Sequence, residues 1–264
     1  FILPVATAFC ISVYGFFEAL SIRTEHVTIA TTKLPPAMPR LRIVQLSDVH
    51  LGLIVREERL ARILAAVRAA EPDLLVITGD LLDGQPDGYA PLARMIGAIK
   101  SKLGKFAITG NHEYYVGLGE MEAFCREAGL TLLRGEETSA GGVVNIAGVD
   151  DPAGERAGLT HRVSESALLQ GLPTDGYTLL LKHRPVVAAE ARGLFDLQLS
   201  GHVHKGQIFP FNIVTHFFYP VKMGLSAAGS GSSLYVNRGA GTWGAPIRFL
   251  APPEVTVIDL VRGV

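Results

Sequence analysis

The stretch Leu41–His50 reads Leu-Arg-Ile-Val-Gln-Leu-Ser-Asp-Val-His, an apolar run that ends in a carboxylate and an imidazole. Four other apolar runs of the chain end in polar residues of the same kinds. They are Leu74–Thr78 before Gly79-Asp80, Lys105–Thr109 before Gly110-Asn111-His112-Glu113, Tyr177–Leu181 before Lys182-His183, and Phe195–Leu199 before Gly201-His202-Val203-His204. Polar side chains at the carboxyl ends of parallel strands converge on the crevice in which an α/β sheet binds its ligand. The pattern predicts one site assembled from five segments.

The side chains at these strand ends are of the types that bind metal ions. The candidate ligands are Asp48, His50, Asp80, Asn111, His183, His202 and His204. Two carboxylates, one amide and four imidazoles suit hard-to-borderline divalent cations, and they are enough for two ions. Any one of these histidines alone would more often be an ordinary surface or core residue. Their recurrence at the ends of successive apolar runs favours a metal centre.

The segments between the motifs alternate between helical and strand-like patterns. Helices are expected over Glu57–Ala70, Pro91–Lys102, Glu120–Ala128 and Val163–Leu169, and further strands over Val143–Val149, Leu234–Val236 and Val255–Leu260. Strand–helix–strand units predict a largely parallel sheet with helices outside, and the strand-rich second half fits two packed sheets flanked by helices. The Gly/Ser-rich segment Ala227–Ser233 is expected to be a flexible loop.

The five fragments together resemble the calcineurin-like metallophosphoesterase superfamily, whose pattern is D-x-H, G-D-x-x-D, G-N-H-[DE], a lone His and G-H-x-H. The resemblance covers roughly residues 40 to 262 and is closest to a bacterial membrane-associated phosphodiesterase branch. It implies a four-layer αββα sandwich. Lys205 departs from the pattern, because relatives usually have Gly there. This departure leaves the metal ligands intact and bears on the approach of the substrate.

The resemblance also implies a role for each motif residue. Asp48, His50 and His204 would hold one metal ion, Asn111, His183 and His202 would hold the other, and Asp80 would bridge both. An anionic bridge is needed between two close cations, and such a pair lowers the pKa of a bound water and neutralises phosphoryl oxygens. The expected reaction is attack of a metal-bound hydroxide on phosphorus. These donors accept Mn, Zn, Fe or Mg alike.

His112 and Asp83 are expected to lie just outside the metal ligands. The resemblance implies that His112 hydrogen-bonds the phosphoryl group or protonates the leaving oxygen, and a neighbouring carboxylate would keep it protonated. Asp83 could orient a ligand, or it could form an Asx turn before Gly84. Lys205 is a weaker candidate for a substrate contact.

The N-terminal segment predicts a membrane helix. Residues Phe1–Phe17 contain no charged side chain, and as a helix they would span about 25 Å, at the low edge for a bilayer core of roughly 30 Å. A chain that begins at Phe1 rather than Met is expected to be a processed or truncated product. We therefore expect a truncated transmembrane helix over residues 1–22, with a signal-peptide core or a buried helix as alternatives.

A linker is expected over residues 23–39, followed by the metallophosphoesterase domain over residues 40–264. The Pro-rich stretch Lys33–Pro39 would make this linker stiff. Between Arg23 and Arg42 four basic residues face one acid. The positive-inside rule then favours a cytoplasmic domain at a bacterial inner membrane. Some relatives are exported, which leaves the membrane side open.

Composition and an aromatic segment bear on the substrate. The net charge is −1 and no basic run is present, so nucleic acid is an unlikely partner. Gln207–Tyr219 carries five aromatic residues, which would either cover the sheet or contact a lipid interface. We expect a phosphodiester or pyrophosphate substrate, and specifically a lipid-linked one such as UDP-2,3-diacylglucosamine or a phospholipid headgroup. A soluble or cell-wall diester and a non-catalytic scaffold are the alternatives.

Overall fold

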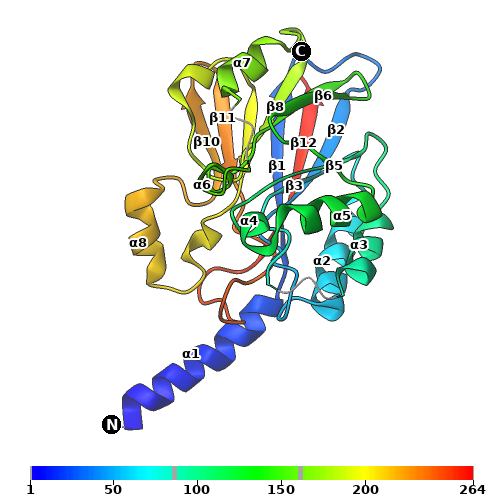
Figure 1. Cartoon of the computed structure of the whole chain (residues 1–264). Coiled ribbons are helices and arrows are strands. Elements are labelled where there is room, and N and C mark those ends of the chain that lie inside the picture. The colour runs from blue at the N-terminus through cyan, green and yellow to red at the C-terminus, as the bar shows by residue number, and fades with distance from the viewer. Residues whose placement is uncertain (1, 85–87, 160–162, 264) are drawn as a thin grey trace.

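The computed structural model describes residues 2–84, 88–159 and 163–263. Its first element is the helix α1 (Ile2–Leu20), which projects away from a body of two sheets and flanking helices (Figure 1). Only Gly15, Glu18 and Ala19 of α1 are buried, all near its C-terminal end. The helix therefore touches the body at one end and exposes the rest of its length.

The first sheet carries three of the five polar motifs. Its strand order is β1-β12-β2-β3-β4-β5. The strands are β1 (Arg23–Thr31), β2 (Arg40–Leu46), β3 (Leu74–Thr78), β4 (Lys105–Ile108), β5 (Thr131–Leu132) and β12 (Glu254–Arg262). β2 to β5 are parallel, β12 is antiparallel to β2, and β1 is parallel to β12. The parallel order places the loops after β2, β3 and β4 at one edge.

The expected linker over residues 23–39 is wrong for its first half. Arg23–Thr31 pairs with Glu254–Arg262 along the whole length of β1 and forms the edge of the first sheet. The pairing partner lies more than 200 residues away, so no local sequence pattern predicts that this segment is a strand. Only the segment between Thr31 and Arg40, which holds the prolines, connects two strands without regular structure.

The second sheet carries the remaining two motifs. Its strand order is β10-β11-β9-β8-β7-β6. The strands are β6 (Glu136–Ala140), β7 (Val144–Gly148), β8 (Tyr177–Leu181), β9 (Leu197–Ser200), β10 (Gly224–Gly229) and β11 (Ser232–Val236). β7, β8, β9 and β11 are parallel, and each edge is closed by an antiparallel strand. The expected loop Ala227–Ser233 is instead the tip of the β10–β11 hairpin, because its small residues pair across a turn.

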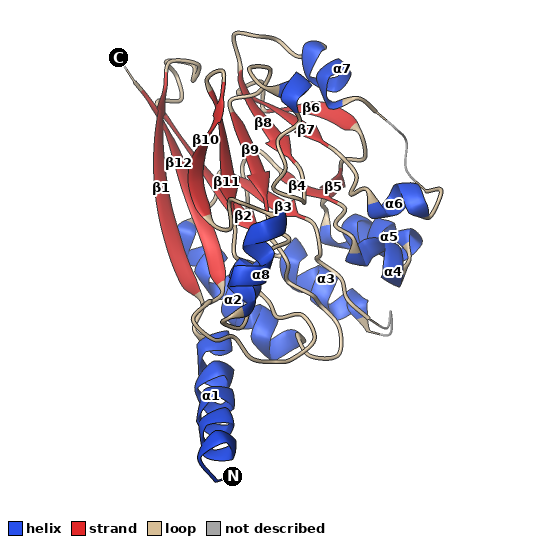
Figure 2. Cartoon of the chain, turned by 90° about the vertical axis from the view of Figure 1, so that its left-hand side faces the viewer, coloured by secondary structure: helices blue, strands red, loops and turns tan. Residues whose placement is uncertain are grey.

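Helices cover the outer face of each sheet, as Figure 2 shows. α2 (Glu57–Ala70), α3 (Tyr89–Gly97) and α5 (Leu118–Ala128) pack on the first sheet, and α7 (Glu165–Gln170) and the turn η1 (Ala189–Ala191) pack on the second. Alternate residues of β2 show the layering: Val44 faces the helices, whereas Ile43 faces the second sheet. The four-layer αββα architecture is confirmed.

Three short elements surround the strand ends. α4 (His112–Val116) follows β4, α6 (Ala153–Arg156) follows β7, and the turn η2 (His204–Gly206) leads into α8 (Phe211–Phe218). No residue of α8 is buried. The interpretation of the aromatic segment as a buried cover for the sheet is therefore wrong for its four phenylalanines, which are exposed, whereas Tyr219 is partly buried against the cluster of Val203, Leu234 and Val236.

Candidate metal centre

The ligand candidates lie on loops that leave their strands abruptly. Five of them have left-handed backbones: Asp48 (φ 51°), His50 (φ 53°), Asp80 (φ 50°), His202 (φ 75°) and His204 (φ 48°). Such φ values are uncommon for residues other than glycine and cost of order 1 kcal/mol or more each. They turn successive polar side chains toward one point. Strain concentrated on one set of loops is typical of a functional site.

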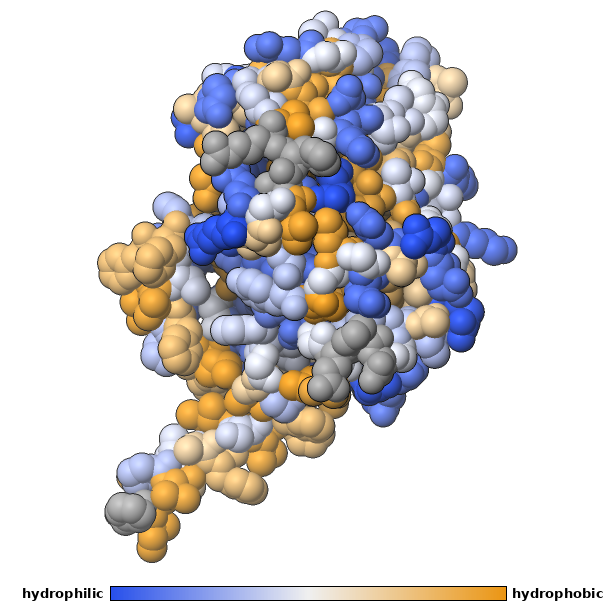
Figure 3. Space-filling view, in the orientation of Figure 1, coloured by the Kyte–Doolittle hydropathy of each residue, from blue (hydrophilic) through white to orange (hydrophobic). Residues whose placement is uncertain are grey.

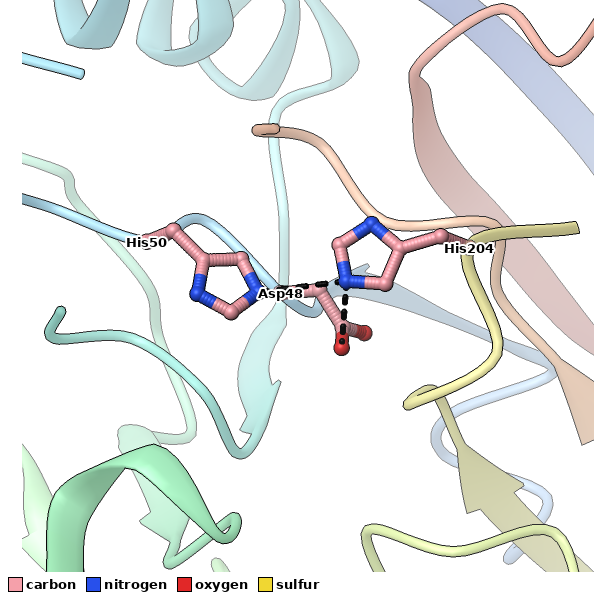
Figure 4. Close-up of side chains that lie close together, drawn as sticks. All are labelled: Asp48, His50 and His204. Atoms are coloured by element: carbon pink, nitrogen blue, oxygen red, sulfur yellow. Dashed lines mark hydrogen bonds and ion pairs between the residues drawn. The ribbon is translucent and has the colours of Figure 1, made fainter. Parts of the chain in front are cut away.

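One group of three side chains joins the two sheets. Asp48, His50 and His204 point toward one another from the loops after β2 and β9 (Figure 4). The Nε2 atoms of His50 and His204 are 3.1 Å apart, and His204 Nε2 is 3.3 Å from Asp48 Oδ1. All three residues are buried. This is the set that the sequence assigned to one metal ion.

A second group lies beside the first. Asp80, His183 and His202 bring one carboxylate and two imidazoles together. His183 Nε2 is 3.2 Å from Asp80 Oδ2 and 3.1 Å from His202 Nδ1. His183 Nδ1 is 2.8 Å from the carbonyl oxygen of Thr78, so its N–H donates there and Nε2 stays available to a cation.

The Asp80 carboxylate lies between the two groups. Its Oδ2 is 3.2 Å from His183 Nε2 and 3.9 Å from His50 Nε2, one ring from each group. Its Oδ1 accepts the backbone N–H of His112 at 2.9 Å. A single carboxylate that faces both groups is what a bridging ligand requires.

Asn111 completes the donor set. Its side-chain oxygen is buried and has no hydrogen-bond partner among the described residues. A buried acceptor without a partner is costly unless a cation or another donor satisfies it. With Asn111 added to the two groups, the donors are three oxygen-bearing side chains and four imidazoles, and they fit two divalent cations.

The charges of the site suit cation binding. Although burial opposes the effect, the surrounding imidazoles hold the pKa values of Asp48 and Asp80 well below their usual range. Burial lowers the pKa values of His204 and His202 to about 4, whereas Asp80 outweighs burial and raises the pKa of His183 to about 10, so a cation would replace the proton of that ring. These carboxylates are ionised and the imidazoles of His202 and His204 neutral at physiological pH, which are the forms that bind metals.

His112 and Asp83 form a pair at the rim of the centre. His112 Nδ1 is 3.0 Å from Asp83 Oδ1, and the other carboxylate oxygen of Asp83 is 3.5 Å from His50 Nδ1. Burial opposes protonation of His112, but the Asp83 contact outweighs it and raises the pKa of the imidazole. This geometry favours the orienting role of Asp83 over the Asx-turn alternative.

Lys205 adopts a left-handed backbone (φ 52°) directly after His204. It belongs to neither group of candidate metal ligands among the described residues. Its partial burial lowers the pKa of its amine. Its position beside the centre agrees with a substrate contact and does not by itself assign one.

Glu113 was quoted in a motif but given no role in the sequence analysis. Its buried carboxylate accepts four backbone N–H groups, from Asp80, Leu81, Leu82 and Gly110, at 2.6 to 3.0 Å. It therefore ties the loop after β3 to the loop after β4. The signal was available as the acidic fourth position of Gly-Asn-His-Glu, but the motif alone does not say which groups the acid binds.

Arg248 is the second residue that sequence reasoning missed. Its side chain is fully buried, and its guanidinium donates to the carbonyl oxygens of Arg238, Gly239, Gly241 and Ala251. Its Nη2 also lies 3.2 Å from His204 Nδ1. Burial lowers the pKa of this guanidinium to about 9. No local pattern around Arg248 marks it as a support of the site.

Comparisons with known proteins agree with this geometry. The profile of the calcineurin-like phosphoesterase family matches residues 41–206. A metallophosphoesterase of Aquifex aeolicus (strain VF5) is 38% identical over 96% of this chain and 97% of its own length. A metallophosphoesterase of Bacillus subtilis (strain 168) is 34% identical over 94% of this chain and 89% of its own length.

A relative in Danio rerio, described as a transmembrane protein with metallophosphoesterase domain, is 34% identical over 95% of this chain, which spans 60% of that protein. The structure and these matches agree on the reaction class and on the need for two divalent metal ions. The chain therefore belongs to the calcineurin-like phosphoesterase family and is a metal-dependent phosphoester hydrolase.

Proposed function

We propose that this protein is a membrane-anchored phosphodiesterase or pyrophosphatase. In this proposal one ion is held by Asp48, His50 and His204, the other by Asn111, His183 and His202, and Asp80 bridges them. The observation that carries it is the position of the Asp80 carboxylate between the two groups. Two bound ions supply charge neutralisation of the phosphoryl oxygens and a bound water of lowered pKa.

His112 is the proposed proton donor to the leaving oxygen. The Asp83 carboxylate holds the Nδ1 side of the ring at 3.0 Å, so the opposite nitrogen is left to face the substrate. The Asp83 contact, which raises the pKa of His112 against the effect of burial, favours the protonated ring that an alkoxide leaving group needs. Asp83 acts through His112 and His50 as a positioning residue.

The membrane anchor is α1. It is long and apolar enough to cross a bilayer, and 17% of its most apolar window is buried in the body, which does not suit a core helix. The description of the Danio rerio relative as a transmembrane protein supports the same interpretation. The excess of basic residues between Arg23 and Arg42 favours a cytoplasmic catalytic domain at the inner membrane.

A lipid-linked substrate is the finer part of the proposal. The support is the exposed aromatic helix α8, which follows the last His-containing motif, Gly201-His202-Val203-His204. A nucleotide-activated acylated sugar such as UDP-2,3-diacylglucosamine, or a phospholipid headgroup, would present a phosphoester at such a surface. The lipid-linked substrate is tested by comparing the turnover of UDP-2,3-diacylglucosamine with that of soluble diesters in mixed micelles. A preference for soluble diesters would contradict a lipid-linked substrate.

The ligand set is tested by Asp80→Asn with the Mn²⁺-loaded chain and bis-p-nitrophenyl phosphate as substrate. Loss of the bridging charge removes several kcal/mol of transition-state stabilisation, so kcat/KM should fall roughly 10³-fold. Bound metal, measured by elemental analysis, should also fall. The exposed Asp175→Asn variant is the matched control and should retain both properties. Unchanged activity and metal content in Asp80→Asn would overturn the assignment.

A further inference from the structure

A groove of about 400 Å³ adjoins the metal centre. Its apolar wall is formed by Val203, Ile208, Phe211, Thr215, Tyr219 and Trp243. His202 and His204 also line it, so the groove begins at the proposed ligands and extends under α8. Binding pockets for small molecules typically measure roughly 300–1,000 Å³. The groove is therefore large enough to hold part of a substrate whose phosphoester lies at the centre.

Two polar side chains of the groove, Gln207 and Thr215, form hydrogen bonds with the protein itself. The Gln207 amide donates to the carbonyl oxygen of Trp243 at 2.7 Å and accepts the backbone N–H of Trp243 at 2.9 Å. The Thr215 hydroxyl donates to the carbonyl oxygen of Asn212 at 3.2 Å. These bonds fix one wall against the other and leave apolar surface toward the groove. Such a lining suits a hydrocarbon chain and not a sugar or a peptide.

The outer face of α8 is also apolar. Phe217 is 81% exposed and Phe218 73% exposed, and Trp243 across the groove is 57% exposed. Figure 3 shows hydrophobic surface over α8 and along α1 on the same face of the molecule. A gathering of large apolar side chains on the surface marks a contact with a membrane or with another protein.

Residues 248–249 contact both α1 and the segment that leads into α8. The backbone N–H of Arg248 donates to the carbonyl oxygen of Gly15 in α1, and the ring of Phe249 lies edge-on to Tyr14 at 5.7 Å. The same Phe249 exchanges backbone hydrogen bonds with Gln207 and Phe209 ahead of α8. The position of α8 relative to α1 is thus fixed through residues 248–249. The apolar surfaces of α8 and α1 therefore keep their place on the same face of the molecule (Figure 3).

We infer that the groove binds an acyl chain of a membrane-embedded phosphoester, while α8 and Trp243 lie in the leaflet where α1 ends. This inference rests on the proposed function and adds where the lipid part of the substrate is held. The groove connects the bilayer surface to the centre, so a lipid can place its phosphoester on the metal ions with its chain still in apolar surroundings. A second copy of the chain on α8 is the competing occupant.

The groove is tested with p-nitrophenyl butyl, octyl and dodecyl phosphate, which share one leaving group. The substrates are given to the Mn²⁺-loaded full chain in phosphatidylcholine vesicles. Each buried methylene is worth roughly a fourfold gain in affinity, so the octyl ester should exceed the butyl ester at least tenfold in kcat/KM. Thr215→Trp, which fills the groove, should bring this ratio near one. Val214→Trp, on the exposed side of the same helix, should keep it.

Partition of the esters into the vesicles is the same for all variants, so the ratio isolates the groove. If the octyl-to-butyl ratio of kcat/KM is equal in the parent, Thr215→Trp and Val214→Trp, the acyl site is overturned, but the proposed phosphodiesterase activity is not affected. No metal-dependent hydrolysis of any ester by the parent would instead contradict the proposed function itself. The two failures are therefore distinguishable.

The bilayer contact is tested with the single tryptophan of the chain, Trp243. In vesicles of phosphatidylcholine with brominated acyl chains, its fluorescence should be quenched strongly, and aqueous iodide should quench it little. The matched control is Trp243→Phe with Ala167→Trp, which moves the reporter to α7, at the far end of the body from α1 (Figure 1). In the control, iodide should quench the fluorescence strongly and the brominated acyl chains should quench it little. Quenching of Trp243 by iodide only, or a dimer that shields it from both quenchers, would overturn the contact.

Discussion

The metal centre and α8 are neighbours, but the metal centre buries polar side chains whereas α8 exposes apolar ones. At the centre, carboxylates and imidazoles such as Asp48 and His183 are buried. On α8, phenylalanines are exposed and none is covered by the body. Most proteins bury apolar groups and leave charges in water. Here two divalent cations would satisfy the polar groups inside, and in our proposal a bilayer covers the apolar groups outside.

The difference also concerns how each region is held. The centre is fixed by many polar contacts, such as the Glu113 carboxylate under two loops and the Arg248 guanidinium beside His204. By contrast, α8 is fixed at its base by backbone bonds to Phe249. Substitutions in the centre should therefore lower the free energy of unfolding strongly, whereas substitutions on the outer face of α8 should change it little.

The largest expected effect is on catalysis, from His112→Ala. Loss of a positioned acid should lower kcat by roughly 10²- to 10⁴-fold, while both metal ions stay bound. Steady-state kinetics with elemental analysis would check this, with exposed His26→Ala as the matched control. A His112→Ala variant that loses metal would place this residue among the ligands and remove the distinction between ligand and proton donor.

The next effect is on stability, from Glu113→Ala. Four buried N–H groups lose their acceptor, and each such loss costs about 1 kcal/mol or more. We expect the free energy of unfolding to fall by roughly 4 kcal/mol, as measured by urea unfolding in detergent. Exposed Glu120→Ala on α5 serves for comparison and should change little. A loss below about 1 kcal/mol would mean that water replaces the carboxylate.

A polar cluster outside the centre should show a smaller, pH-dependent effect. Burial opposes it, but Arg42 and Arg40 lower the pKa of Asp259 to about 2. The folded-state pKa lies below the unfolded value of about 3.9, so the carboxylate stabilises the fold above that pH and loses its contribution as the pH falls toward 2. Because solvent screens both arginines, we expect a loss of about 1 kcal/mol in Asp259→Asn at pH 7.

The free energies of unfolding of parent and Asp259→Asn should therefore converge as the pH falls from about 4 to about 2. A difference that stays constant over this range would show that the charge of Asp259 is not the source of the effect.

The smallest expected effect is that of the double substitution Phe217→Ser and Phe218→Ser. Because both rings are exposed, the free energy of unfolding in detergent should change by about 0.5 kcal/mol or less. Phe124→Ser on α5, which is buried, is the contrasting variant and should cost several-fold more. If the α8 double variant proves as costly as Phe124→Ser, the helix packs on the body and the contrast between the two regions is lost.

Much of the centre could be predicted because its ligands stand next to buried strands. In each case a short apolar run ends directly in the motif, so the strand places the ligand with few intervening residues. The contact between Asp83 and His112 was open, since it depends on how two separate loops turn. Arg248 could not be foreseen, because an arginine in a loop is ordinarily exposed and its burial depends on how residues 238–251 fold so that four carbonyl oxygens face the guanidinium.

Two errors of the sequence analysis have the same cause. β1 alternates polar and apolar residues, and its partner β12 lies at the other end of the chain. The phenylalanines of α8 would ordinarily predict burial, yet the body does not cover them. In both cases the environment of the segment comes from something far away in sequence or outside the chain. Local pattern describes a segment and not its neighbours.

The pairing of β1 with β12 limits how the domain can move. Only Ser21 and Ile22 separate the end of α1 from the start of β1, and the Glu18 carboxylate of α1 accepts the backbone N–H of Ala251. With α1 inserted as we propose, the domain would stand at a fixed height and tilt over its own bilayer and would not swing to an opposing membrane. The proposed lipid substrate would then arrive by lateral diffusion in the same leaflet, so the collision rate would depend on the surface density of lipid and not on its bulk concentration.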